Sequence, residues 1–302
     1  MGVLKLAACV GAALVACAVI VPAAMAGAPA QRLAPPPPPL KKNYATSWEE
    51  YQDYLKDAKG GTKHTFAQLP DWSGVWTHSG GFALDPSMPR DKIPDMLTPE
   101  YKARYLKKIE DVAKGIEWDP LSYCLPAGYP RWLLEPFLRE NILRPEQAWL
   151  LTEQLAEIRR VYTDGRGHVP DDEAYPLWEG DSIGFWDGDT LVIHTNNLKA
   201  NQYQRLEPDH SDQVTTVERM RKIDANTIED LVTIYDPKAL VKPWRIRQVF
   251  SKVTDPPGLR INHWSCEENN NVVKTGAGTS DFVLPGEQGY KAPTTGAVTA
   301  PK

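Results

Sequence analysis

The carboxyl-terminal half of the chain alternates apolar and polar residues with the two-residue period of a β-strand. Trp244 and Ile246, for example, alternate with Arg245 and Arg247. Short turns rather than helices separate the segments of this kind, so neighbouring strands are expected to be antiparallel. Twisted sheets of about eight strands tend to close or to form two layers. The sequence therefore predicts a mainly β fold, an antiparallel up-and-down barrel or a barrel-like sandwich. The predicted strands are 148–155, 157–163, 182–186, 190–195, 213–223, 227–235, 244–251 and 260–267.

Two hairpin turns support this prediction. Asp187-Gly188 lies between two alternating segments, where an Asp-Gly pair is a strong hairpin signal. Asp224-Ala225-Asn226 separates the next two segments in the same manner. Each pair of segments is therefore expected to form a hairpin.

Two helices are predicted before the strands. Ser47 and Glu50 have the spacing of a capping box, and Gly60-Gly61 ends the helical pattern that follows. Thr98 and Pro99 mark the start of a second helix with an aromatic stripe, which we assign to core packing. We therefore assign residues 44–145 to a helical and loop-rich preface that packs on the barrel, and residues 146–270 to the barrel itself.

The amino-terminal residues 1–26 have the pattern of a secretory signal peptide. Lys5 is the only charged residue, an apolar run follows it, and Ala24-Met25-Ala26 fits a cleavage site. An uncleaved membrane anchor and lipid attachment at Cys17 are the alternatives. We expect a periplasmic or secreted protein that does not span the membrane after cleavage. Residues 27–43 read as a proline-rich linker and residues 271–302 as a flexible tail.

The composition argues against several classes of function. The chain has a net charge of −5 and no stripe of Lys and Arg, so nucleic acid is not an expected partner. It also lacks a glycine-rich nucleotide loop, a nucleophile elbow and a zinc-protease motif. We therefore predict no cofactor.

The cysteines and histidines give two further expectations. Cys124 and Cys266 are the cysteines outside the leader, and in an exported protein they are expected to form a disulfide, with two separate buried thiols as the alternative. The histidines are not spaced as metal ligands on one strand or helix, so no metal site is predicted. A site assembled from His168, His210 and His263 is left open.

The sequence contains an ordered set of motifs, which are Asp71–Trp76, Cys124–Arg131, Tyr162–His168, Gly180–Thr190, His210–Asp212 and Glu218-Arg219. This set resembles a large family of exported, mostly uncharacterised proteins from sphingomonads, acidobacteria and their neighbours. The resemblance covers residues 70–268 and implies a lipocalin-like β-barrel without established chemistry. His194 departs from the family pattern, for which an acid or a small polar residue is expected there. A weaker analogy connects the chain with sphingomonad decarboxylases and lyases that act on phenylcoumaran dimers.

Tyr162, Arg166 and His168 are the first group of candidate site residues. The strand that ends at Thr163 runs into Asp164-Gly165, which is expected to place Arg166 and His168 on a loop at the barrel rim. Arginine can bind a carboxylate, tyrosine can donate a hydrogen bond, and histidine can carry a proton near neutral pH. The structural alternative is a rim salt bridge between Arg166 and Asp171 or Asp172, with His168 in solvent.

A second group lies on the predicted strands and at their ends. His210 is an acid–base candidate, although the adjacent His210-Ser211-Asp212 is not a triad, because neighbours on a strand point to opposite faces. Either Glu218 or Arg219 should point into the barrel, as an acid–base or binding residue or in a buried ion pair with Arg160 or Arg245. Trp178 and Trp186 are predicted to line the ligand site, together with Trp244 and Trp264.

Two functions remain as hypotheses. In the first, a cofactor-independent lyase or decarboxylase acts on a small, lignin-derived aromatic acid. His168, His210, Glu218 and Tyr162 would then move protons, and Arg166 or Arg219 would hold the carboxylate. In the second, a non-catalytic lipocalin-like barrel binds an apolar or aromatic small molecule. A structural module of the cell envelope is a third possibility, supported only by the proline-rich linker.

Overall fold

The computed structural model describes residues 35–116, 119–262, 271–274 and 280–283. The predicted signal peptide, Cys266, His263 and Trp264 lie outside these residues, so the predictions made for them stay predictions. Within the described residues, no helix has the length and apolar character needed to span a membrane.

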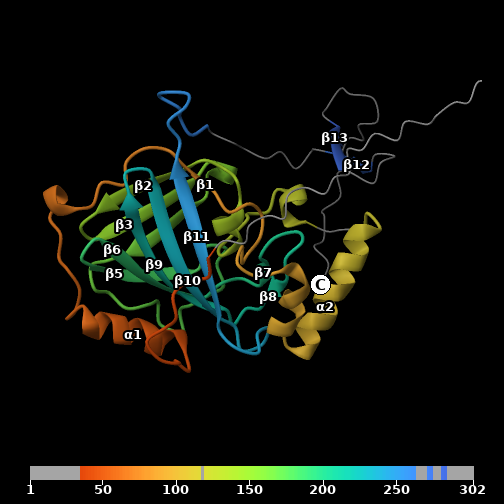
Figure 1. The fold of residues 1–302 in the computed structure, drawn as a ribbon, viewed down its shortest axis with the longest axis horizontal. Coiled ribbons are helices and arrows are strands. Elements are labelled where there is room, and N and C mark those ends of the chain that lie inside the picture. The colour runs from red at the N-terminus through yellow and green to blue at the C-terminus, as the bar shows by residue number, and fades with distance from the viewer. Residues whose placement is uncertain (1–34, 117–118, 263–270, 275–279, 284–302) are drawn as a thin grey trace, which may run out of the picture. The chain divides into compact units, whose positions relative to one another are not determined.

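Nine of the described strands form a closed barrel, which confirms the predicted β-barrel (Figure 1). Around the barrel the strands follow their order in the chain, and β1 closes it by pairing with both β2 and β11. The strands are β1 (Trp76–His78), β2 (Arg139–Arg144), β3 (Gln147–Thr152), β4 (Ile158–Tyr162), β5 (Asp181–Asp187), β6 (Thr190–Asn196), β9 (Thr215–Asp224), β10 (Thr227–Tyr235) and β11 (Trp244–Lys252).

One pair of neighbouring strands is parallel, which corrects the prediction of a fully antiparallel barrel. A closed ring with an odd number of strands cannot alternate direction throughout, so at least one neighbouring pair must run the same way. That pair is β4 and β5, with Val161 opposite Ser182 and Tyr162 opposite Ile183. Residues 163–180 make the connection, and parallel neighbours need such a long segment instead of a tight turn. His168 lies on it.

The barrel begins earlier in the chain than the predicted boundary at residue 146. Both β1 and β2 lie within residues 44–145, the segment assigned to the preface. At the other end, residues 260–262 form no strand, and the rest of the predicted strand 260–267 lies outside the described residues. The predicted tail contains β12 (Asn271–Lys274) and β13 (Ser280–Val283), which pair with each other. A separate two-stranded sheet, β7 (Asn201–Gln202) and β8 (Asp209–His210), interrupts the chain between β6 and β9.

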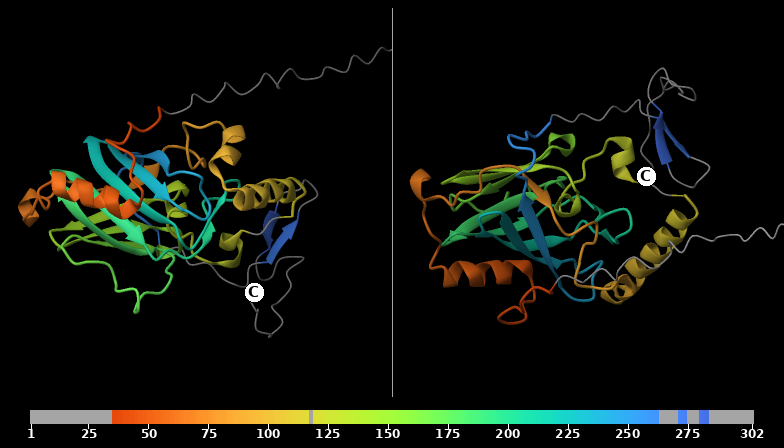
Figure 2. Two further views of the ribbon diagram at one scale, coloured as in Figure 1. Left: turned by 90° about the horizontal axis from the view of Figure 1, so that it is seen from below. Right: turned by 45° about the horizontal axis from the view of Figure 1, so that its top comes forward.

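Helix α1 (Ser47–Asp57) packs on the outer wall of the barrel (Figure 2). Tyr51 and Tyr54 of the helix join a cluster with outward-facing residues of β5, β6 and β9, among them Phe185, Val192 and Val217. The N-cap is Thr46, whose hydroxyl accepts from the backbone N–H of Glu49, and not Ser47 as the capping-box pattern predicts. Ser47 is thereby available for another interaction. The other helices are α2 (Pro99–Ala113) and the short 3₁₀ segments Phe66–Gln68, Arg90–Met96, Pro120–Tyr123, Arg131–Leu134 and Gln154–Ala156.

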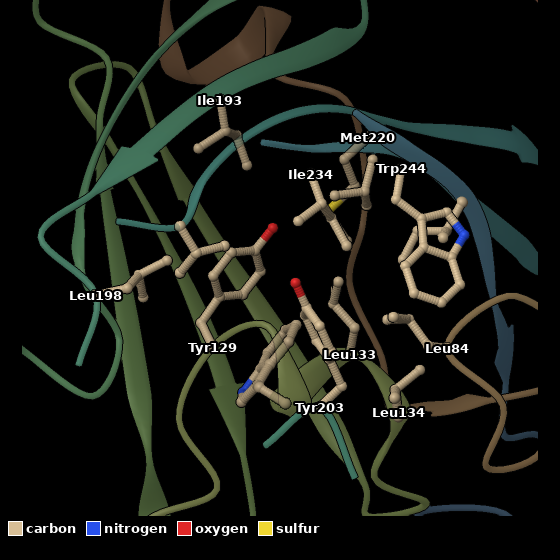
Figure 3. Packing of buried hydrophobic residues seen from close by; sticks show 14 of the residues in the cluster. Leu84, Tyr129, Leu133, Leu134, Ile193, Leu198, Tyr203, Met220, Ile234 and Trp244 are labelled. Carbon is tan, nitrogen blue, oxygen red and sulfur yellow. The ribbon is translucent and has the colours of Figure 1, made fainter. Parts of the chain in front are cut away.

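The inside of the barrel is filled by side chains. Alternation sends Leu191, Ile193 and Thr195 of β6 inward, whereas Val192 and His194 face α1. Figure 3 shows Trp244, Leu84 and Leu134 gathered on one side of this core and Tyr129, Leu198 and Ile193 on the other. The hollow bounded by Trp76, Trp132, Arg139, Asn141, Met220 and Phe250 has no volume for a water-sized molecule. No ligand therefore fits in this hollow, and the predicted ligand space beside Trp178, Trp186, Trp244 and Trp264 stays a prediction.

Candidate functional site

The candidate residues from the sequence do not converge on one site. Tyr162 and Arg166 lie at the rim, and Glu218 lies inside the barrel. His168 lies under α1, and His210 and Trp178 line a pocket outside the barrel. Each location therefore has to be judged on its own contacts.

Arg166 and Tyr162 form a local arrangement at the surface. The Arg166 guanidinium binds the carboxylate of Asp164, with Nη2 2.7 Å from Oδ2, and lies 4.1 Å from the centre of the Tyr162 ring. The predicted alternative named Asp171 or Asp172 as the partner, and the structure places Asp164 there instead. Arg166 is more than half exposed, so this pair is a weak ion pair of the surface.

Glu218 points inward and forms an ion pair with Arg159. The Nη1 and Nη2 atoms of Arg159 lie 2.8 Å and 2.5 Å from the two carboxylate oxygens. The predicted partners were Arg160 and Arg245. Arg159 also stacks on the ring of Tyr129. Burial and the neighbouring Glu218 carboxylate raise the pKa of Asp230 well above its usual range. Glu218 therefore points inward in a buried ion pair, as the structural alternative predicts, although with Arg159 as its partner; a catalytic role for it stays a prediction.

Arg219 and Trp186 take part in packing and not in a ligand site. Arg219 faces outward, where it binds Asp187 at 3.1 Å and covers the ring of Tyr54. Trp186 is 2% exposed and packs edge-on against Trp72 in the core. Strand alternation explains both positions, because each residue sits on the face opposite to its neighbour.

His168 belongs to a chain of hydrogen bonds on the outer wall. Its Nδ1 lies 2.7 Å from Oδ2 of Asp181, and its Nε2 lies 2.7 Å from Nδ1 of His194. Nε2 of His194 lies 2.9 Å from the hydroxyl of Ser47, which is 2.7 Å from the hydroxyl of Thr215. His168 is thus not a solvated rim residue. No local sequence pattern shows that Asp181 and Ser47 contact these two histidines. Asp181 is therefore not among the predicted site residues, and Ser47 is predicted only as part of a helix cap.

Burial influences the charge states of His194 and Asp181 in this series of hydrogen bonds. Burial and, to a smaller extent, the nearby His168 lower the pKa of His194 to about 3, and Asp181 opposes this shift. Burial disfavours the charged form of Asp181, but hydrogen bonds from His168 and from the backbone N–H of Val169 outweigh it and lower the pKa of the carboxyl. Asp181 is therefore a carboxylate and His194 a neutral imidazole at neutral pH.

A pocket outside the barrel is lined by residues of α2 and of the sheet of β7 and β8. Figure 1 shows where these elements lie. The pocket has a volume of about 880 Å³. Cationic side chains are prominent in its lining: Arg104, Lys108, Lys199, Arg205 and Lys238. Apolar and aromatic side chains form much of the rest: Tyr101, Val112, Ile116, Pro120, Leu125, Trp178 and Ala200. Asp111, Asp209 and Asp212 also line it, so the cations exceed the acids.

His210 has the most specific chemistry in this pocket. Its Nδ1 lies 3.2 Å from the carbonyl oxygen of Ser211, and because a carbonyl only accepts, Nδ1 carries the hydrogen. Burial lowers the pKa of His210, which favours the neutral imidazole. Its Nε2 is then an acceptor, and it has no hydrogen-bond partner among the described residues. Nε2 is itself buried behind the pocket lining, so a donor group on a ligand can satisfy this orphaned acceptor only after the lining moves aside.

Two neighbouring residues hold His210 in this state. The hydroxyl and the backbone N–H of Ser211 both donate to Asp236, which fixes the segment that carries the accepting carbonyl. The hydroxyl of Ser211 also accepts from the backbone N–H of Gln213, so this side chain caps a backbone amide in the turn before β9. His210-Ser211-Asp212 is therefore not a triad, as expected.

The cations of the pocket differ in their availability. Lys108 is engaged by the carbonyl oxygens of Gln204 and Glu207 and by Asp209. Lys199 instead lies 4.5 Å from the centre of the Trp178 ring, and the described residues give it no carboxylate partner. Lys199 is thus free to bind an anion that rests against Trp178.

Within the described part of the chain, no group of three or more His, Cys, Asp or Glu residues is arranged to hold a metal ion. Comparisons of the sequence with protein-family models and with curated proteins found no match.

Proposed function

We propose that the protein binds a small aromatic carboxylic acid in the pocket between α2 and the β7–β8 sheet. The observation that carries this proposal is the buried Nε2 of His210, which has no hydrogen-bond partner among the described residues and lies behind a pocket lining that is both cationic and aromatic. A buried acceptor without a partner costs free energy, so a ligand that donates a hydrogen bond to it gains affinity.

Each chemical part of such a ligand has a partner. A carboxylate would pair with Lys199, whose ammonium group has no acidic partner within the part of the chain that the structure describes. A flat ring would pack against Leu125, Val112 and Trp178. A phenolic hydroxyl would donate to Nε2 of His210. The ligand class is therefore a phenolic acid, a narrower form of the aromatic ligand expected from the sequence.

A second candidate function, a cofactor-independent decarboxylase or lyase, rests on the same imidazole. His210 would take the phenolic proton, which makes the ring electron-rich and assists loss of the carboxylate as CO₂ while the carbon atom takes a proton in its place. The hydroxyl of Tyr101, which also lines the pocket, is a possible proton source. His168 and Tyr162 have no part in this proposal, because neither lines the pocket.

Export also belongs to the proposal. The signal-peptide pattern of residues 1–26 and the pair Cys124 and Cys266 support a periplasmic or secreted location, where a disulfide would persist. An exported protein with this pocket would meet its ligand outside the cytoplasm.

Calorimetric titration with three related probes tests the binding. The probes are 4-hydroxycinnamate, cinnamate without the phenol, and the methyl ester of 4-hydroxycinnamate without the free carboxylate. We expect 4-hydroxycinnamate to bind best and each truncated probe to bind roughly 10-fold more weakly, since a hydrogen bond to the charged Lys199 contributes about 1.5–3 kcal/mol and an unsatisfied buried acceptor at the neutral His210 costs about 1–3 kcal/mol. Equal affinity for all three probes, or no binding of any, contradicts the proposal.

Two variants localise the binding site. Lys199→Gln should weaken 4-hydroxycinnamate and leave the methyl ester unaffected. Lys102→Gln is the matched control, because Lys102 is an exposed lysine of α2 that does not line the pocket. His210→Gln should abolish the advantage of the phenol. Incubation with 4-hydroxycinnamate, followed by chromatography for 4-vinylphenol, separates a decarboxylase from a binding protein.

A further inference from the structure

The donor and the acceptor of each hydrogen bond on the outer wall can be assigned by starting from the Asp181 carboxylate. The Asp181 carboxylate only accepts, so Nδ1 of His168 carries a hydrogen. A neutral His168 then accepts at Nε2, which requires the hydrogen between the two imidazoles to belong to Nδ1 of His194. Nε2 of His194 is consequently an acceptor, and the hydroxyl of Ser47 donates to it. The hydroxyl of Thr215 supplies the remaining hydrogen, to the oxygen of Ser47.

This chain can carry a proton away from Ser47 without losing a hydrogen bond. If the hydroxyl proton moves to Nε2 of His194, the hydrogen on Nδ1 of His194 can move to Nε2 of His168. The positive charge then rests on His168, beside the Asp181 carboxylate. Burial disfavours a charge on His194, so the second imidazole and its carboxylate provide the better place for it.

We propose that Ser47 is a nucleophilic serine that accepts an acyl group from a small ester, with His194, His168 and Asp181 as its proton relay. The arrangement reproduces the roles of a serine, a base and an orienting acid with one additional imidazole between base and acid. It is distinct from the pocket at His210 and does not depend on the function proposed for that pocket. Ser47, Thr215 and the relay come from α1, the 163–180 connection and strands β5, β6 and β9.

The acyl transfer balances as follows. Oγ of Ser47 forms a bond to the carbonyl carbon of the ester, and its proton passes to Nε2 of His194 while the Nδ1 hydrogen of His194 passes to His168. The bond between the carbonyl carbon and the alkoxy oxygen then breaks. The departing oxygen takes the proton from Nε2 of His194, and His168 returns its proton to Nδ1. An alcohol leaves and an acyl-serine remains, which water can hydrolyse by the same route.

Helix α1 also offers donors to the oxygen that becomes negative during this step. Ser47 and Trp48 are the first two residues of α1, and backbone N–H groups in the first turn have no acceptor within the helix. A negative oxygen beside them is stabilised in the way an oxyanion hole stabilises one.

Trp48 controls access to Ser47. Ser47 is 4% exposed, whereas the side chain of Trp48 is 45% exposed and its ring lies edge-on to the His194 ring, with 5.3 Å between centres. The ring also stacks on Tyr51 and lies against His168, so it has to leave these contacts to swing outward and admit a small ester. Removing the ring should increase the rate of reaction at Ser47.

Mass spectrometry of the full chain after treatment with p-nitrophenyl acetate and with a small alkyl fluorophosphonate tests the proposal. Wild-type protein should gain one label, mapped to the peptide containing Ser47. Ser211 is the internal control, because it is also buried but its hydroxyl is hydrogen-bonded to the Asp236 carboxylate and not to an imidazole. Ser47→Ala should remove the label, and Trp48→Ala should label faster than wild type. His168→Gln should slow labelling on the order of 100-fold, the loss expected for general-base assistance.

Circular dichroism should confirm that each variant is folded. Absence of label at Ser47 in both wild type and folded Trp48→Ala overturns the proposal, because the second variant removes the barrier to access. Labelling of Ser211 as fast as Ser47 overturns it as well, since the reaction would then not need the relay. An unchanged labelling rate in His168→Gln has the same meaning.

Discussion

Arg159 and Glu218 face each other inside the barrel, from β4 and β9, with two charge-assisted hydrogen bonds between them and each side chain 1% exposed. The hydroxyl oxygens of Ser182 and Thr195 accept hydrogen bonds from the same guanidinium, so the pair is embedded in a polar network and not simply placed in an apolar core. Such a pair connects strands on different parts of the ring through its interior.

Removal of one partner of this pair should destabilise the protein strongly. Glu218→Ala leaves the Arg159 guanidinium buried without its carboxylate, and we expect the free energy of unfolding to fall by about 3–5 kcal/mol. Urea unfolding followed by fluorescence measures it. The double variant Arg159→Met, Glu218→Leu should lose less than Glu218→Ala alone, because no isolated charge remains; a larger loss in the double variant would contradict this account.

Ionisation of the buried Glu207 carboxyl should lower the free energy of unfolding as the pH rises. Burial raises its pKa to about 7 from an unfolded value near 4.5, an effect that Arg90 only partly opposes. Its stabilising contribution is complete below pH 4.5 and is lost as the pH rises through 7, with a total of about 3 kcal/mol. Glu207→Gln should therefore be more stable than wild type at pH 8 and show no such advantage at pH 4.5. Parallel melting curves at both pH values provide the check.

Buried His78, in contrast to Glu207, should make the protein less stable as the pH falls. Its Nε2 lies 2.7 Å from Oε1 of Gln248 inside the barrel, and burial lowers its pKa from 6.5 to about 4. Its contribution is present above pH 6.5 and is lost as the pH falls through 4, amounting to about 3 kcal/mol. Nuclear magnetic resonance titration of the ring should show a neutral imidazole at pH 5. A normal titration near pH 6.5 in the folded protein would refute the burial argument.

Gly184 should not tolerate even one added methyl group. A Cβ at this position would lie 2.6 Å from the carbonyl oxygen of Val192 and 3.1 Å from Cγ1 of Val161. Gly184→Ala should thus cost about 1–3 kcal/mol through overpacking. Gly167→Ala is the matched control, since a Cβ there meets nothing within 4 Å, and its unfolding midpoint should match wild type. Equal midpoints for both variants would show that β5 and β6 can separate without cost.

The barrel could be predicted because its hairpins carry a local signal. The segments around Asp187-Gly188 and Asp224–Asn226 appear as β5–β6 and β9–β10 with nearly the expected bounds. β1 and β2 could not be found in this way, because β1 has three residues and β2 places the polar Arg139 inward. The parallel pairing of β4 and β5 follows only from the strand count of the closed ring.

The candidate sites were less predictable, because they depend on contacts between distant residues. His168 and His210 were selected from the sequence, but their neighbours come from other elements. Ser47 and His194 are 147 positions apart, and the pattern around Ser47 indicated only a cap. The pocket at His210 needs α2, whose Tyr101 belongs to a stripe that reads as core packing. Local periodicity contains no information about contacts between residues that are distant in the sequence.

The closure of the barrel has a consequence for its behaviour under stress. A complete ring exposes no unpaired strand to other molecules, which protects against strand-to-strand aggregation. Here the ring closes through the short β1, which matches β11 at Trp76, Thr77 and His78 but β2 only at Trp76 opposite Arg139. Local opening of the barrel will therefore begin between β1 and β2. The backbone of β2 would then be unpaired, and a second molecule would first bind there.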